Sequence, residues 1–200
     1  MQFDTTFTTA LIRWGHILAG IIWLGFFLFL HFVVRPYVLC LKGEAQAEGY
    51  RRLIGRGLRW CRGAGITTFL LGIGVLGHLW AKQAYSGASV PLNGRGRFIM
   101  WGMTLAVAML VNLLFLVSKA QNGILNAFAS GLGPSDQQFA RVRRLSLVNV
   151  YLTGPMLYLM IFANNFGPLF HYGHVGIGVV LGLATMHIIV ILAERGARVG

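Results

Sequence analysis

The sequence is poor in charged residues and has very few acidic ones. Only 11 % of its 200 residues are charged, and five of them are aspartate or glutamate. An average soluble domain has about 25 % charged residues, so this chain lacks the surface that keeps such a domain in solution. Two cysteines are too few for a small domain built on disulfides, and 56 % hydrophobic residues exclude a disordered chain. An integral membrane protein remains.

Five apolar runs are long enough to cross a bilayer, since a transmembrane helix needs about 20 predominantly apolar residues. They cover residues 8–34, 63–81, 98–117, 145–163 and 173–193. The runs lack the alternation of barrel strands. The sequence therefore predicts an all-α fold, an integral membrane bundle of five transmembrane helices that forms a single membrane domain over residues 1–200.

The positive charges flank these runs. Most of the 17 lysines and arginines follow the first, third and fifth runs. By the positive-inside rule, the N-terminus is expected outside and the C-terminus in the cytoplasm, in the cytoplasmic (inner) membrane of a prokaryote. The same distribution assigns the net charge of +12 to membrane topology, so the expected partner is the lipid bilayer and no nucleic acid.

Two connecting segments mix apolar and basic residues. Residues 44–60 are typical of an amphipathic helix lying on the anionic inner leaflet, or of a plain connector. Residues 121–144 are expected to hold a second helix, broken at residues 131–134, where two glycines precede a proline.

Histidines inside the apolar runs are costly and indicate a functional site. His16 and His78 both lie toward the outer ends of their runs, so the two imidazoles are expected to face each other. Two facing imidazoles supply the axial ligands of a six-coordinate haem iron. The alternative is that each histidine forms a hydrogen bond with a neighbouring helix.

The residues around this pair also suit haem. Arg13 lies three residues before His16 and is a candidate partner for a propionate, and Gly20 would let a porphyrin approach the helix. A second pair, His31 with His187, lies toward the inner side, where Arg35 follows His31 by one turn. The sequence thus predicts one haem b or two.

Polar residues surround Pro155 in the fourth run, where the proline is expected to kink the helix. They are Asn149, Tyr151, Thr153 and Tyr158. Either these groups form hydrogen bonds between helices, or they line a pocket for a quinone or another small substrate.

Three segments carry a family resemblance. The first reads Arg13-Trp14-Gly15-His16, followed by Gly20 and by Trp23-Leu24-Gly25; the second is Gly96-Arg97-Phe98-Ile99-Met100-Trp101-Gly102-Met103; the third runs from Asn149 through Pro155-Met156-Leu157 to Met160. In this order and spacing they resemble the membrane domain of bacterial urate hydroxylases, the urate oxidase N-terminal family. The first segment is also similar, more distantly, to copper-resistance D-type proteins and membrane protoporphyrinogen oxidases.

The resemblance implies a helical, cytochrome-like membrane domain with a histidine in its first span. Longer members of the family carry a C-terminal cytochrome c domain, whereas this sequence has no C-x-x-C-H motif. A c-type cytochrome or other membrane subunits are therefore the expected partners. The leading hypothesis is a haem-binding, b-type electron carrier that acts as an oxidoreductase subunit of a larger membrane complex. The alternatives are a urate oxidase-like membrane enzyme and a cofactor-free structural subunit.

Overall fold

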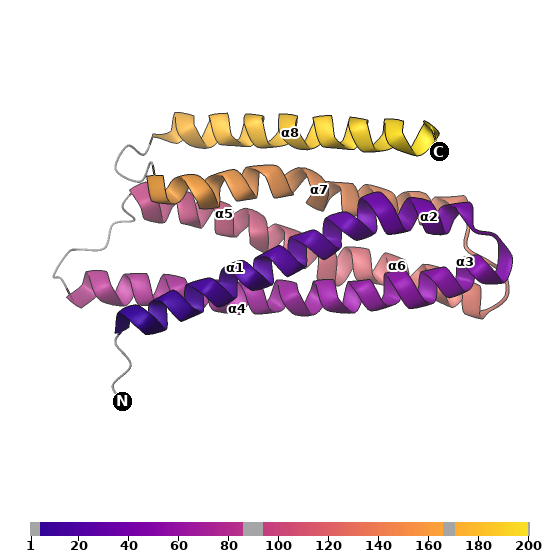
Figure 1. Ribbon diagram of the computed structural model, residues 1–200, viewed down its shortest axis with the longest axis horizontal. Helices are drawn as coiled ribbons and strands as arrows, with labels where there is room; N and C mark the ends of the chain where they lie inside the picture. Colours follow the sequence, from indigo (N-terminus) through magenta and orange to yellow (C-terminus); the bar gives the residue numbers. More distant parts are fainter. Residues whose placement is uncertain (1–4, 86–93, 166–170, 200) are drawn as a thin grey trace.

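The computed structural model describes residues 5–85, 94–165 and 171–199, and every regular element among them is helical. Five helices are long and apolar enough to cross a membrane: Thr6–Cys40, Gly43–His78, Gly94–Ala129, Asp136–Ala163 and Tyr172–Arg195. Each predicted run overlaps one of them, which confirms the all-helical, multi-pass membrane architecture. The first span begins at one end of the bundle, and the last helix ends at the opposite end (Figure 1). Which end faces the cytoplasm stays a prediction.

Several spans are built from consecutive helical elements. The first comprises α1 (Thr5–Phe29), η1 (Leu30–Val34) and α2 (Arg35–Cys40), and the second comprises α3 (Gly43–Gly49), η2 (Tyr50–Ile54) and α4 (Gly55–Tyr85). The third comprises α5 (Gly94–Val111), η3 (Asn112–Val117) and α6 (Ser118–Ala129). The fourth is α7 (Asp136–Asn165), which continues through Pro155, and the fifth is α8 (Tyr172–Val199). The three η segments are π-helical turns.

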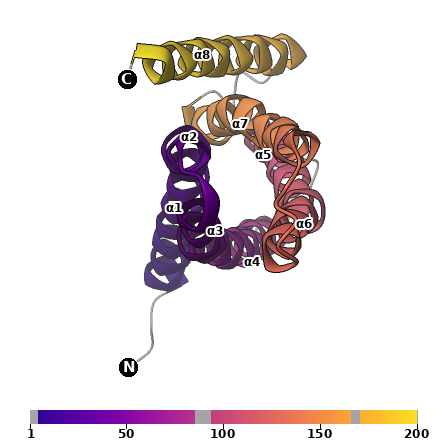
Figure 2. The same ribbon diagram turned by 90° about the vertical axis from the view of Figure 1, so that its right-hand side faces the viewer.

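The long helices pack against one another in pairs. α1 packs along α4, α5 packs along α7, and α8 packs on the opposite side of α7. Viewed from the end, α1 to α4 form one wall and α5 to α7 the other, with α8 outside α7 (Figure 2). α7 therefore lies between the last helix and the rest of the bundle.

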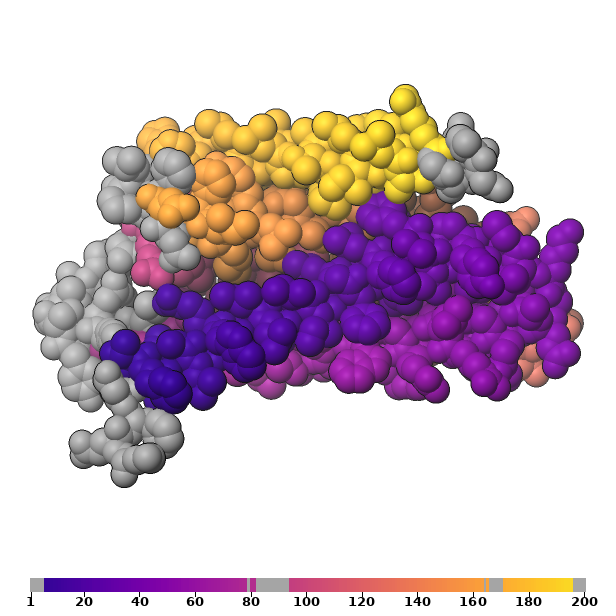
Figure 3. Space-filling model, in the orientation of Figure 1, coloured from indigo at the N-terminus to yellow at the C-terminus, as the bar shows by residue number. Residues whose placement is uncertain are grey.

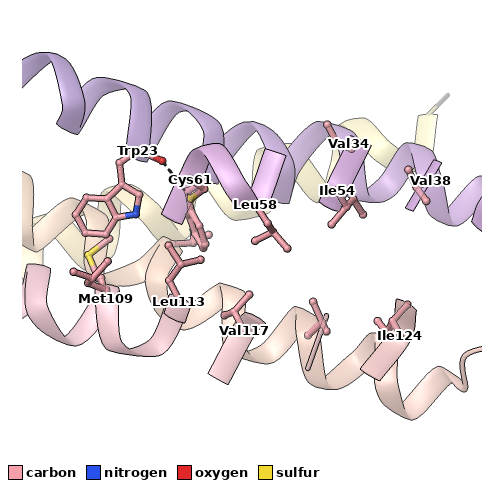
Figure 4. Packing of buried hydrophobic residues seen from close by; sticks show 14 of the residues in the cluster. Trp23, Val34, Val38, Ile54, Leu58, Cys61, Met109, Leu113, Val117 and Ile124 are labelled. Atoms are coloured by element: carbon pink, nitrogen blue, oxygen red, sulfur yellow. Dashed lines mark hydrogen bonds between the residues drawn. The ribbon is translucent and has the colours of Figure 1, made fainter. Parts of the chain in front are cut away.

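The core joins the two walls. From the first wall come Trp23, Val34 and Val38, with Ile54, Leu58 and Cys61 facing them (Figure 4). The second wall contributes Met109, Leu113, Val117 and Ile124. Large apolar side chains also remain exposed on the outer surface, including Ile21, Leu70, Phe115 and Val180. An apolar exterior of this kind is stable only in contact with lipid.

The segment at residues 44–60 is helical, as one alternative predicted, but it is continuous with the second span. Tyr50, Ile54 and Leu58 share one face because they are spaced four residues apart, and all three are buried in the bundle. Burying this face holds the segment in line with α4 instead of leaving it free to lie on a leaflet surface.

The predicted break near residue 131 is confirmed. α6 ends where the Gly131 and Gly133 backbones take positive φ angles of 74° and 69°, a conformation that glycine adopts without strain. α7 then begins with a capping box, in which the Gln138 N–H donates to the Ser135 hydroxyl oxygen and the Ser135 N–H donates to the Gln138 side chain.

Candidate functional site

His16 lies in the contact between α1 and α4. Its Nδ1 is 2.8 Å from the carbonyl oxygen of Thr68. A carbonyl only accepts, so Nδ1 carries the proton and donates it. In the neutral imidazole this proton position leaves the lone pair on Nε2.

The ring approaches the α4 backbone closely because position 72 is glycine. A Cβ atom at Gly72 would lie 3.0 Å from the His16 Cε1, so a larger residue would push the ring away from the Thr68 carbonyl. Gly20, one turn after His16, would place its Cβ 3.7 Å from the Thr68 methyl group, an ordinary packing distance. Arg13, on the preceding turn, is exposed.

His78 belongs to the same interface but lies at a different level. Its Nε2 is 2.5 Å from the Thr9 hydroxyl oxygen, and Thr9 precedes His16 by seven residues, which is about 10 Å along the helix. The structure therefore places both predicted ligands between α1 and α4, but each ring contacts a different level of the partner helix. It does not bring them together around one position.

His31 repeats the arrangement of His16 nearer the other end of the first span. Its Nδ1 is 2.8 Å from Ser146 Oγ, and the Ser146 hydroxyl donates to the Arg143 carbonyl. Having used its only proton, the hydroxyl accepts from the His31 Nδ1–H, which again leaves Nε2 with a lone pair. One turn later, the buried Arg35 donates through Nη2 to the Phe139 carbonyl at 2.5 Å.

His187 contacts a different face of α7. Its Nδ1 lies 2.9 Å from the Tyr151 hydroxyl, with the two rings roughly parallel. Tyr151 and Ser146 are five residues apart, which is a rotation of about 140° around the helix. Because His31 contacts Ser146 and His187 contacts Tyr151, the structure does not bring this second predicted pair together either.

The fourth-span polar residues form hydrogen bonds between and within helices. The fully buried Asn149 donates to the Met109 carbonyl and accepts from Asn112, which also donates to the Leu145 carbonyl. Thr153 donates within α7 to the Asn149 carbonyl. This matches the first alternative for the residues around Pro155.

Sequence reasoning missed one polar contact, that between Tyr50 and Gln121. The Tyr50 hydroxyl donates to the Gln121 side-chain oxygen, and both residues are buried. Tyr50 belongs to η2, and Asn112 begins η3. π-Helical turns often occur at functional sites because the extra residue redirects side chains. The sequence gives no sign of the contact between Tyr50 and Gln121, because both residues are uncharged and they lie 71 positions apart.

Replacing Tyr50 with phenylalanine is expected to lower the free energy of unfolding by roughly 1–2 kcal/mol, because the buried Gln121 oxygen loses its donor. The ring and its contacts with Phe128 and Phe139 remain. Chemical unfolding in detergent measures the effect, with Tyr37→Phe as control because Tyr37 is exposed. Equal stability of the two variants would show that the hydrogen bond contributes nothing.

The described residues contain no group of three or more His, Cys, Asp or Glu side chains that could hold a metal ion. Cys40 and Cys61 are free thiols, one exposed and one buried. The candidate site therefore consists of single imidazoles, His16 and His31, each oriented by a hydrogen bond to a neighbouring helix.

Comparison with known proteins gives one match. A family model described as urate oxidase N-terminal matches residues 56–194, more than two thirds of the chain. The matched range runs from the start of α4 into α8 and does not include His16 and His31. No curated protein matches, and no solved structure matches.

Proposed function

This chain belongs to the urate oxidase N-terminal family, and we propose that it is the membrane-embedded, haem b-binding subunit of an oxidoreductase. It would exchange electrons with a c-type cytochrome or with other membrane subunits. His16 would hold the haem through Nε2. When bound, the haem iron supplies one-electron redox chemistry.

The observation that carries the proposal is the hydrogen bond from His16 Nδ1 to the Thr68 carbonyl oxygen. Histidines that bind metals almost always donate their other ring N–H to a carbonyl or carboxylate, which fixes the tautomer and the ring orientation. The acceptor here is a main-chain oxygen of α4, so helix packing itself holds the imidazole. His16 is prepared to bind through Nε2 without losing any bond it now makes.

A single imidazole is enough to hold a haem, but it is not enough to hold a bare metal ion. A structural or catalytic zinc ion takes three or four protein ligands, and the described residues offer no such group. A porphyrin supplies the equatorial nitrogens itself, so its iron needs only one or two side chains. Arg13, exposed on the turn before His16, is the candidate partner for a propionate.

His31 is the candidate ligand of a second haem. Its Nδ1–H is donated to Ser146, and Arg35 lies one turn away. The two histidines are separated by 15 residues, about 22 Å along the helix, so they would hold separate groups on the two sides of the bilayer.

Replacing His16 with alanine or glutamine is expected to remove at least half of the bound haem b, because the porphyrin loses its iron–imidazole bond. The measurement is haem per protein by pyridine haemochrome assay on purified protein, with helix content measured by circular dichroism. His171→Ala is the matched control, because His171 is exposed just before α8. Full haem content in folded His16→Ala, His16→Gln and His31→Ala variants would overturn the ligand assignment.

A second candidate function follows from the family name alone: oxidation of urate or a related compound. Membranes that contain the chain and an added c-type cytochrome would then consume urate, and would reduce two cytochromes for each urate oxidised by two electrons. Haem-loaded protein that leaves urate unchanged with this acceptor would contradict this second function but not the haem proposal.

A further inference from the structure

A groove lies between α1 and α4 and begins beside His16, since its lining includes Ala19, three residues after His16, and Thr67, next to Thr68. Its volume is ≈ 600 Å³, and it is lined by Ala19, Ile22, Arg56, Arg59, Trp60, Gly63, Ala64 and Thr67. Figure 3 shows α1 lying along α4. No histidine lines the groove, so its own lining offers no imidazole to a haem iron.

The lining has a cationic end and an apolar length. Arg56, Arg59, Gly63 and Thr67 recur every three or four residues and so form one stripe along α4. The stripe extends about 16 Å, close to half of the roughly 30 Å hydrocarbon layer. Beyond the arginines, the walls are small or apolar. A charged head and one acyl chain of a single leaflet have this length and polarity.

The arginines of the groove are available to an anion. Arg56 and Arg59 are exposed, and the groove lining contains no carboxylate. The ion pairs in the described part of the chain use other arginines, Arg51 and Arg52 with Glu48 and Arg143 with Glu194. A compensating negative charge must therefore come from outside the protein.

Trp60 indicates where the arginine end of the groove lies relative to the bilayer. Its ring stacks on Phe26 of α1, with centroids 6.2 Å apart and planes 8° from parallel, while remaining 59 % exposed. Tryptophan is enriched at the level of lipid headgroups. Ile21, Ile66 and Leu70, on the same two helices, are exposed and apolar. The groove thus opens onto a surface that contacts lipid, not water.

We propose that this groove binds an anionic phospholipid. Arg56 and Arg59 hold the phosphate by charge-assisted hydrogen bonds. One acyl chain lies against Ile22 and along Ala19, Gly63 and Ala64, whose small size leaves room for it. Basic pockets between transmembrane helices are suited to anionic headgroups, and the bound lipid would fix the contact between α1 and α4.

The test uses nanodiscs of phosphatidylcholine that contain phosphatidylglycerol with brominated acyl chains, which quench tryptophan fluorescence on contact. The Trp60 signal is the difference between each protein and its Trp60→Phe counterpart. We expect phosphatidylglycerol to quench Trp60 at roughly 25-fold lower lipid fraction than brominated phosphatidylcholine, since each of the two arginines contributes about a fivefold preference for an anionic surface.

Charge-matched variants separate the groove from the general surface potential. Arg56→Gln/Arg59→Gln is expected to abolish the preference, whereas Arg51→Gln/Arg52→Gln removes the same charge outside the groove and should retain it. Gly63→Leu places a side chain in the groove at a position where nothing lies within 4 Å of the added Cβ. It should reduce quenching, whereas Gly25→Leu, equally unobstructed on α1, should not. No preference in the wild type, or an equal loss in both arginine pairs, would overturn the proposal.

Discussion

Replacing Gly182 with alanine is expected to loosen α8 from α7 and to lower the free energy of unfolding by about 3 kcal/mol, toward the upper end of overpacking costs. A Cβ atom at Gly182 would lie 2.6 Å from the Gly154 carbonyl carbon and 2.7 Å from the Pro155 Cα. Both are main-chain atoms, so no side chain can rotate aside. The two helices would have to move apart.

The reciprocal change, Gly154→Ala, is expected to have a similar effect, because its Cβ would lie 2.8 Å from the Gly182 carbonyl carbon. Gly178 and Gly182 form a G-x-x-x-G pattern, which lets membrane helices approach closely. α8 makes its main contact with α7, so little else would hold it in place.

Thermal unfolding in detergent, followed by circular dichroism, measures this effect. Gly176→Ala is the control: it changes a glycine of the same helix, but nothing lies within 4 Å of the added Cβ. Equal stability of Gly182→Ala and Gly176→Ala would show that the close contact between α7 and α8 does not exist in the membrane protein.

Replacing Asn149 with leucine is expected to destabilise the bundle by roughly 2 kcal/mol, although the two side chains have similar volumes. The buried amide donates to the Met109 carbonyl at 2.9 Å and accepts from Asn112 at 2.7 Å. Leucine removes both interactions. A hydrogen bond between membrane helices is worth about 0.6 kcal/mol on average and up to about 1.7, and the amide of Asn112 also loses one acceptor.

Unfolding of the reconstituted protein by a denaturing detergent gives the free-energy difference. The matched control is Asn122→Leu, which changes an exposed asparagine of α6. If both variants lose the same stability, the hydrogen bonds that link α5 and η3 to α7 are not a source of stability, and Asn149 is free to serve a substrate pocket instead.

The spans could be predicted from sequence because the bilayer imposes a length of apolar residues that few other structures share. Their full extent could not. α4 begins at Gly55, whereas the apolar run was placed at residues 63–81, because the helix continues through arginines whose neighbours Leu58 and Cys61 are buried. Hydropathy marks where lipid contacts a helix, not where its hydrogen bonds begin.

The partners of the histidines could not be predicted for a different reason. Sequence gives the position of His16 along its own helix, but not how far α1 slides along α4. That register is set by small residues at the contact. Gly65 accommodates the Trp23 ring, and Gly72 accommodates the His16 ring. The register places Thr68, not His78, beside His16.

The central claim is that this membrane protein holds haem b. Absorption spectra of the purified, detergent-solubilised protein test it most directly. The spectra are recorded on the oxidised protein and again after reduction with dithionite. The account predicts a b-type α-band on reduction and at least one haem per chain by pyridine haemochrome assay. A folded protein from its native membrane with no visible absorption in either state would contradict it, and would favour the cofactor-free structural subunit.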